Sequence, residues 1–406
     1  MQYTLKTIAG ISVLFAPSEN NSTTIEILVK AGSLYETRET NGISHFLEHM
    51  FFKWGKKYTS PHDVAAYVDT FGGEFNAFTA EEYAGYYVKS APEHTPKALD
   101  ILADMMVHPA FPKEELEREK LVVIQELKMY EDRPDRQAYN KFKTYMYGDN
   151  SYGREIIGTE DNIRSFTQED LFKHKQDLYT KDNMLIVIAG KILQQEVLEG
   201  LIASLFQEIP EKKAVVKPPF VHHNPSNAME SYVKWTQQAH VVIGAWWYDS
   251  NKHERFAASL LGVILGGNMS SRLFQNIREK MWLCYYISWS HYANTDEGMF
   301  MIRAGIEKER LDIGLEAIYK EIESIAQGNI TEQEYHKAQW FMTGKTQMGI
   351  ESSDELGDFL GAQQLLKGHI HSLDEILEEY KKVTLDDLKT VAQNLSRERL
   401  YTFYVG

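Results

Sequence analysis

The sequence predicts an α+β fold made of two similar halves, and two observations support this prediction. A proline-rich segment, PEKKAVVKPPFVHHNPSN at 210–227, holds four of the 11 prolines and divides the chain into halves of about equal size. On each side of it the same order of elements occurs: a strand, a helix, a charged turn and a long helix. Internal duplication explains this order, although chance can also produce it in an α+β protein.

The elements of the two halves can be matched in sequence order. In the first half, the strand-like run GYYVKSAP at 85–92 leads to an apolar helical pattern and then to a helix over Pro112–Tyr130. Proline and acidic residues in the first turn of that helix are typical of a helix start. In the second half, MFMIRAGI at 299–306 leads to a helical pattern at 311–325, and a further helix starts at Thr331.

Composition and charge exclude several classes of protein. The chain has 406 residues and a formal net charge of -15, which argues against nucleic acid or an anionic membrane as the main partner. Its single cysteine, Cys284, excludes an internal disulfide and favours a reducing compartment. No apolar run reaches the length of a transmembrane helix, and the N-terminal run 8–16 continues into an alternating strand at 23–30. We therefore expect a cytoplasmic protein without membrane insertion.

The stretch GISHFLEHMFF at 42–52 sets two histidines and a glutamate into an apolar run. On a helix, His45, Glu48 and His49 lie on one side, and burying all three requires partners. Two imidazoles at i and i+4 can bind one Zn²⁺, while the carboxylate beside them reaches the zinc-bound water. The alternative is a pair of buried histidines bonded to backbone carbonyls, but H-x-x-E-H is rare by chance.

A catalytic zinc site needs a third protein ligand, and the helix over Pro112–Tyr130 offers Glu119 and Glu126 on one face. Glu126 follows the apolar run LVVIQ at 121–125, where the helix enters the core. A carboxylate in that position needs a cation, so Glu126 is the better candidate for a zinc ligand.

These residues resemble a known family. The motif His45-x-x-Glu48-His49 followed by Glu126 is similar to the inverted zinc-binding motif of the family of pitrilysin, insulin-degrading enzyme and mitochondrial processing peptidase. Three longer segments extend the resemblance over nearly the whole chain: KAGSLYETRETNGISHFLEHMFFKWGKKY, GGEFNAFTAEEYAGYYV and SSRLFQNIREKMWLCYYI. The chain resembles a short, bacterial-type, processing-peptidase-like member. The resemblance implies two similar domains related by duplication, each a mainly antiparallel sheet with helices packed on one face.

The resemblance also implies roles for individual residues. His45, His49 and Glu126 would bind one zinc per chain, Glu48 would be the general base, and Glu119 would support the site without reliably binding metal. The remaining matches concern substrate: Asn76 and Ala77 would pair with its backbone, and Arg278 and Tyr285 would hold it near the scissile bond. Without the family match, Arg278 would be read as a surface ion-pair partner and Tyr285 as a packed aromatic residue.

The expected function is that of a zinc-dependent endopeptidase acting on peptides or unfolded segments, with zinc-bound water activated by Glu48 and Tyr285 as candidate oxyanion donor. The expected domains are a catalytic zinc-binding domain at 1–212, a linker at 213–228 and a homologous, substrate-holding domain without zinc at 229–406. The resemblance implies that chains of this length pair, so we expect a homodimer. One alternative is a non-catalytic or substrate-capturing subunit of a processing-peptidase-like heterodimer, and another is a zinc-dependent binding protein without turnover.

Overall fold

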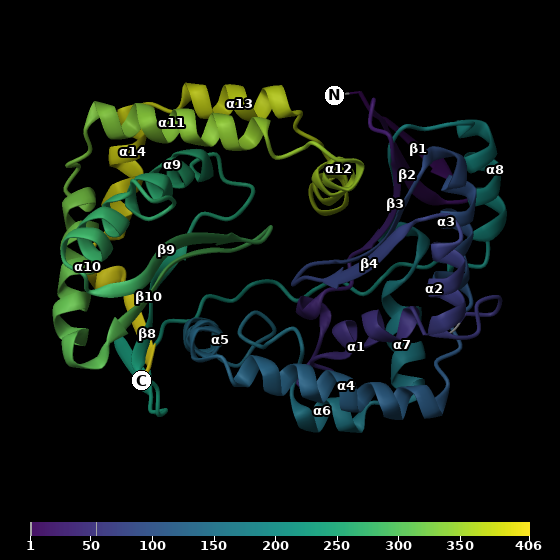
Figure 1. The fold of residues 1–406 in the computed structure, drawn as a ribbon, viewed down its shortest axis with the longest axis horizontal. Coiled ribbons are helices and arrows are strands. Elements are labelled where there is room, and N and C mark those ends of the chain that lie inside the picture. The colour runs from purple at the N-terminus through teal and green to yellow at the C-terminus, as the bar shows by residue number, and fades with distance from the viewer. Residues whose placement is uncertain (1, 54) are drawn as a thin grey trace. The chain divides into compact units, whose positions relative to one another are not determined.

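The computed structural model describes residues 2–53 and 55–406 and confirms an α+β fold with two sheets (Figure 1). The chain divides by contact into two compact units, called here the first and the second unit. The first unit holds Met1–Lys128, Arg154–Pro218 and Gly349–His371. The second unit holds Met129–Gly153, Pro219–Met348 and Ser372–Gly406.

The sheet of the first unit has six strands in the order β1-β2-β6-β3-β5-β4. Their bounds are β1 Thr4–Ile8, β2 Ile11–Pro17, β3 Thr23–Val29, β4 Glu74–Thr79, β5 Ala84–Ser90 and β6 Met184–Gly190. Only β2 and β6 pair in parallel, and the other neighbours are antiparallel. Every residue of β3 and of β6 is buried, since these central strands are covered on both faces.

The sheet of the second unit has five strands in the order β7-β11-β8-β10-β9. Their bounds are β7 Met229–Tyr232, β8 Gln238–Trp247, β9 Cys284–Ala293, β10 Gly298–Glu307 and β11 Tyr401–Val405. Its first pair, β7 and β11, is parallel and the others are antiparallel. Apart from the additional β1, the two sheets therefore agree strand for strand in order and direction, as the predicted duplication requires.

In both halves helices lie between corresponding strands, and α8, which follows β6, has no counterpart after β11. Those of the first half are α1 Ile43–Phe51, α2 Pro61–Asp69, α3 Thr95–Val107, α4 Lys113–Glu131, α5 Pro134–Tyr147, α6 Glu160–Ser165, α7 Gln168–Leu178 and α8 Gln195–Leu205. Those of the second half are α9 Arg255–Leu265, α10 Leu311–Ala326, α11 Glu332–Gln347, α12 Ser353–Lys367, α13 Leu373–Lys382 and α14 Leu385–Ala392. The predicted start at Thr331 is confirmed, because its side chain forms a capping box with Glu334.

Two of these helices pack on the sheet of the other half of the sequence. Helix α5 packs on β8 and β11 of the second unit, and α12 packs on β3 and β6 of the first unit. Figure 1 shows the yellow α12 beside the purple strand β3. Small residues allow the close approach of α12, since a Cβ at Gly361 would lie 2.6 Å from Leu28. The predicted boundaries at 212/213 and 228/229 follow chain order rather than contact, and they stay a prediction.

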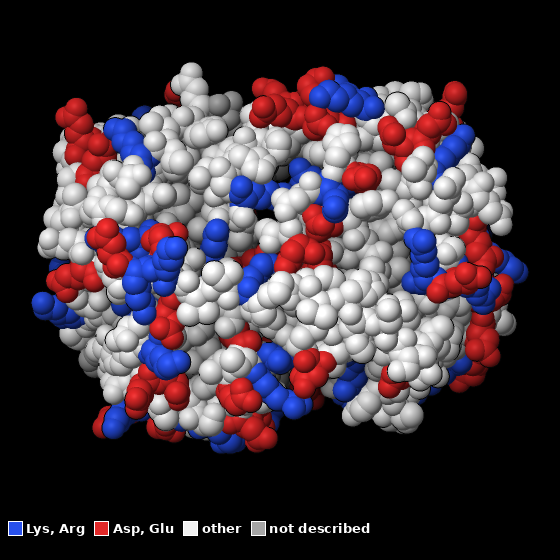
Figure 2. Space-filling view, turned by 180° about the vertical axis from the view of Figure 1, so that it is seen from behind, with Lys and Arg blue, Asp and Glu red and all other residues white. Residues whose placement is uncertain are grey.

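The surface carries both signs of charge. Figure 2 shows Lys and Arg side chains interspersed with Asp and Glu side chains on the face drawn. Among residues 2–53 and 55–406, no helix combines the length and the apolar character that a membrane crossing needs.

One buried carboxyl group of the second unit ties helix α5 to the turn before β10. Glu297 accepts hydrogen bonds from the Tyr147 hydroxyl and from Asn294 Nδ2, each over 2.6 Å. Burial raises the pKa of Glu297 from 4.5 to about 7, although both hydrogen bonds lower it. Between these values the folded protein binds more protons than the unfolded chain, so its stability falls as pH rises through this window.

This linkage predicts the behaviour of Glu297→Gln. Relative to the Gln variant, the wild type should lose stability as pH rises from 5 to 7.5, by at most about 3 kcal/mol. Thermal denaturation across this pH range measures both slopes. Glu309→Gln, at an exposed position, is the matched control and should keep the wild-type slope. An unchanged slope in Glu297→Gln would show that Glu297 does not titrate in this window.

Candidate metal centre

Helix α1 carries the predicted motif on one side, as the spacing requires. Its buried residues face the core of the first unit, whereas His45, Glu48 and His49 are only partly buried. The rings of His45 and His49 lie edge to face with their centroids 4.7 Å apart. One turn of helix therefore places two imidazoles side by side.

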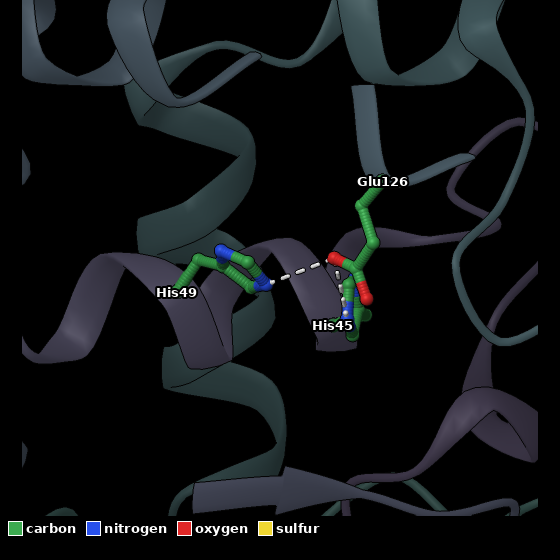
Figure 3. A group of neighbouring side chains, drawn as sticks. All are labelled: His45, His49 and Glu126. Atoms are coloured by element: carbon green, nitrogen blue, oxygen red, sulfur yellow. Dashed lines mark ion pairs between the residues drawn. The ribbon is translucent and has the colours of Figure 1, made fainter. Parts of the chain in front are cut away.

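Helix α4 brings a carboxylate to these rings. Glu126 Oε2 lies 3.7 Å from His45 Nε2 and 3.5 Å from His49 Nε2 (Figure 3). One ligand atom from each of the three residues lies within 4.8 Å of the others. Figure 3 shows that both rings come from one helix and that Glu126 reaches toward them from another.

Glu119 lies beside the cluster, in contact with the opposite nitrogen of one ring. Its Oε1 is 2.8 Å from His49 Nδ1, and its Oε2 is 2.8 Å from Lys53 Nζ. A carboxylate that accepts a hydrogen bond from Nδ1–H fixes the orientation of the ring. The lone pair of Nε2 is then available to a metal. This geometry supports the expectation that Glu119 assists the site without binding the metal.

The pKa shifts of the two histidines run in opposite directions. Burial and the neighbouring His49 lower the pKa of His45 to about 4. Burial also lowers the pKa of His49, but hydrogen bonds to Glu119 and Glu126 outweigh it and raise the value to about 9. A raised pKa favours a proton on His49 Nε2, the nitrogen that faces Glu126, so a metal that binds this nitrogen should release that proton.

The donor set fits a zinc-type cation. Two imidazole nitrogens and one carboxylate oxygen are a known ligand set of catalytic zinc sites, which keep a further position open. The three donors converge from two rigid helices, and the second nitrogen of His49 is already held. In the described part of the chain, this is the only group of three or more His, Cys, Asp or Glu side chains close enough to share an ion.

Glu48 lies beside the cluster but outside it. Burial raises the pKa of Glu48, while a hydrogen bond from the Thr79 hydroxyl lowers it. Thr79 Oγ1 donates to Glu48 Oε2 over 2.5 Å. One oxygen of this carboxylate is thus fixed by strand β4.

The predicted substrate-pairing residues lie on that same strand. Asn76 and Ala77 are paired with β5, and β4 is the last strand of the sheet order. Within residues 2–53 and 55–406, the opposite side of β4 has no strand partner. An exposed edge next to Glu48 can accept an extended peptide by strand addition.

Arg278 and Tyr285 belong to the second unit, whereas the metal cluster belongs to the first. Arg278 Nε donates to the Tyr285 carbonyl over 2.9 Å, so the two residues predicted as a pair are neighbours. Residue Tyr285 is 77% exposed. Both line a pocket of about 330 Å³ that also includes Trp282 and Cys284.

Sequence reasoning missed two polar contacts of the site. Lys53 lies in the turn after α1, two residues beyond its last residue Phe51, so helical spacing did not indicate its contact with Glu119. Thr79 is a polar residue at the end of a strand, a weak signal because hydroxyls are common there. A further feature that was not predicted is the π-helix Leu273–Lys280, which contains Arg278.

Two family models match this chain. Residues 13–160 match "Insulinase (Peptidase family M16)" and residues 165–342 match "Peptidase M16 inactive domain". The chain belongs to peptidase family M16. A Bacillus subtilis relative, described as the uncharacterized zinc protease YmxG, is 36% identical over 386 residues, which cover 94% of this chain and 93% of the relative. A Streptomyces coelicolor relative, described as the uncharacterized zinc protease SCO5738, is 30% identical over 395 residues, which cover 95% of this chain and 85% of the relative.

Solved structures share the fold. A protease from Helicobacter pylori superimposes with a TM-score of 0.90 at 23% identity, covering 100% of this chain and 99% of that chain. A Pseudomonas fluorescens structure described as a peptidase M16 inactive domain has a TM-score of 0.92 at 19% identity, with 100% and 98% covered. At these identities the likeness supports the fold alone.

The geometry predicts a graded effect of the two helix glutamates on zinc binding. Glu126→Ala should abolish tight binding because it removes a donor atom. Glu119→Gln should weaken binding by about 10- to 100-fold because it disturbs a partner of a ligand. Competition with a fluorescent zinc chelator measures both affinities. Glu114→Gln, at an exposed position in the first turn of α4, is the control and should bind as the wild type does. Equal effects of all three variants would contradict the assignment.

Proposed function

We propose that this M16 family member is a zinc-dependent endopeptidase that hydrolyses peptides or unfolded segments. The observation that carries the proposal is the convergence of His45, His49 and Glu126, with Glu48 beside them and outside the cluster. The names of the relatives, zinc proteases, agree with this function. A substrate-capturing subunit of a heterodimer would not need all four of these residues.

In this proposal, His45, His49 and Glu126 hold one zinc per chain. The ion would supply a Lewis acid and lower the pKa of a coordinated water to about 7. Glu48 takes the proton from the attacking water and later gives it to the leaving amine. Burial raises the pKa of Glu48, and Thr79 keeps one of its oxygens fixed.

Strand β4 of one copy of the chain and the second unit of another copy would bind the substrate. An extended peptide pairs along the backbone of Asn76 and Ala77, which brings its scissile bond next to Glu48. Arg278 and Tyr285 hold the peptide near that bond, and the exposed Tyr285 hydroxyl is the candidate donor to the oxyanion. The proposed domains are 1–212 for metal binding, 213–228 as linker and 229–406 for substrate holding.

We further propose that two copies of the chain form a homodimer, in which the zinc site of one copy receives Arg278 and Tyr285 from the other. The chain carries both parts, so one gene product can build two complete sites. A closed dimer would admit peptides and unfolded chains and exclude folded proteins. The single cysteine is consistent with the proposed cytoplasmic location.

The enzyme assignment predicts the effect of Glu48→Gln. This variant should retain about one zinc per chain and lose turnover by about 10²- to 10⁴-fold, because a positioned general base is removed and no ligand is lost. Peptide cleavage followed by mass spectrometry, together with elemental analysis, measures both quantities. A strong chelator should abolish wild-type cleavage, and cleavage that survives complete zinc removal would exclude the proposed enzyme.

The shared-site homodimer predicts complementation. Glu48→Gln and Arg278→Ala chains should each be inactive alone, and mixing them under conditions of subunit exchange should restore activity. Mixed dimers would contain one site with both defects and one with neither. A fully active monomer in sedimentation, or no recovery despite proven exchange, would exclude the shared site.

A further inference from the structure

The N-terminus of the metal-binding helix has no capping side chain of its own. Gly42 precedes α1 with φ +98°, a left-handed conformation that favours glycine. A Cβ at this position would lie 2.6 Å from the Ile157 carbonyl oxygen. Serine, aspartate or asparagine, which commonly cap helices, therefore cannot occupy the position without a shift of the neighbouring loop.

The carboxylate of Glu36 takes the place of that cap. Its Oε2 accepts the Gly42 N–H over 2.8 Å and Asn41 Nδ2 over 3.1 Å. Its Oε1 accepts the Ser44 N–H over 2.8 Å. A negative charge at a helix N-terminus is also favoured by the helix dipole.

Glu36 is buried and is fixed in several directions. The residue is 4% exposed, and burial raises the pKa of its carboxyl group to about 7 against the lowering effect of its hydrogen bonds. Arg154 Nη1 donates to its backbone carbonyl over 3.3 Å. Ser44, which Glu36 holds by its N–H, is also held by its hydroxyl, 3.0 Å from His174 Nε2.

The short length of α1 makes this anchor important for the metal centre. His45, Glu48 and His49 follow Ser44 by one, four and five residues, so any shift of the first turn moves all three. At its other end the helix is held through the contacts of His49 and Lys53 with Glu119. The helix is thus fixed between two carboxylates that come from different parts of the first unit.

We propose that Glu36 is a positioning residue for the reaction: its carboxylate fixes the axial and rotational position of α1 and thereby the aim of Glu48 and of both histidines. This inference rests on the proposed peptidase function. A displacement of about 1 Å at reacting groups can reduce a rate by about 10²-fold. The carboxylate, and not only the volume of the side chain, is required, because three donors point at its two oxygens.

Glu36→Gln tests this requirement. The amide has one acceptor oxygen, and its NH₂ group would face at least one of the three donors. With zinc saturation verified, we expect kcat to fall by about 10- to 100-fold while KM stays within about twofold. Glu36→Asp keeps the charge on a shorter side chain and should recover part of kcat. Glu39→Gln, an exposed residue three positions along the same loop that bonds only locally to Thr37, is the matched control and should have wild-type kcat.

A folded, zinc-loaded Glu36→Gln protein with wild-type kcat would overturn the proposal. So would a loss in the Asp variant at least as large as that in the Gln variant, because Asp keeps the carboxylate and Gln keeps only the volume of the side chain. If the Gln variant fails to fold, the Asp variant is judged by the same split between kcat and KM. If the wild-type protein loaded with zinc cleaves no peptide, the proposed function fails by itself, and Glu36 is then judged by zinc affinity alone. Zinc affinity at least 10-fold weaker in Glu36→Gln than in Glu39→Gln supports positioning, and equal affinities exclude it.

Discussion

The metal centre of the first unit depends on one requirement. Charged and polar groups that are buried together must balance one another's charge. Two imidazole rings and the carboxylates of Glu119 and Glu126 meet in a space with little solvent access, where an unbalanced charge costs several kcal/mol. A proton or a cation must lie among them. The opposite pKa shifts of His45 and His49 express the same requirement, since only one of the rings can be charged. Helix α1 supplies the rings, and α4 supplies the acids.

The duplicated scaffold supports this arrangement only once. The two sheets agree in strand order and direction, and α4 corresponds to α11 by its place between strands. When Glu334 is aligned with Glu115, the positions of Glu119 and Glu126 are taken by Ala338 and Lys345. Ala338 is fully buried in the apolar core of the second unit. The second unit thus uses the corresponding helix for packing, with no pair of acids for a metal.

The sequence predicted the parts of the site that depend on local spacing. Helical geometry alone places His45, Glu48 and His49 together. The apolar run before Glu126 was a poor guide to burial, because Leu121 and Val122 are 59% and 52% exposed and Glu126 is only partly buried. Contacts that depend on how the chain folds back on itself could not be predicted in this way. Glu36 caps α1 because Gly42 cannot, Thr79 reaches Glu48 across a sheet edge, and α5 and α12 pack on the sheet of the other half. Each depends on tertiary proximity, and no periodicity in the sequence encodes that proximity.

Anomalous diffraction at the zinc absorption edge, on crystals grown with Zn²⁺, tests the central claim most directly. The account predicts one strong peak in the first unit, about 2.0–2.2 Å from His45 Nε2, His49 Nε2 and a carboxylate oxygen of Glu126. Glu48 and Glu119 should lie close to the zinc ion at this peak without coordinating it. A peak bound by Glu48 or Glu119 in place of Glu126, or no peak at this cluster, would contradict the account.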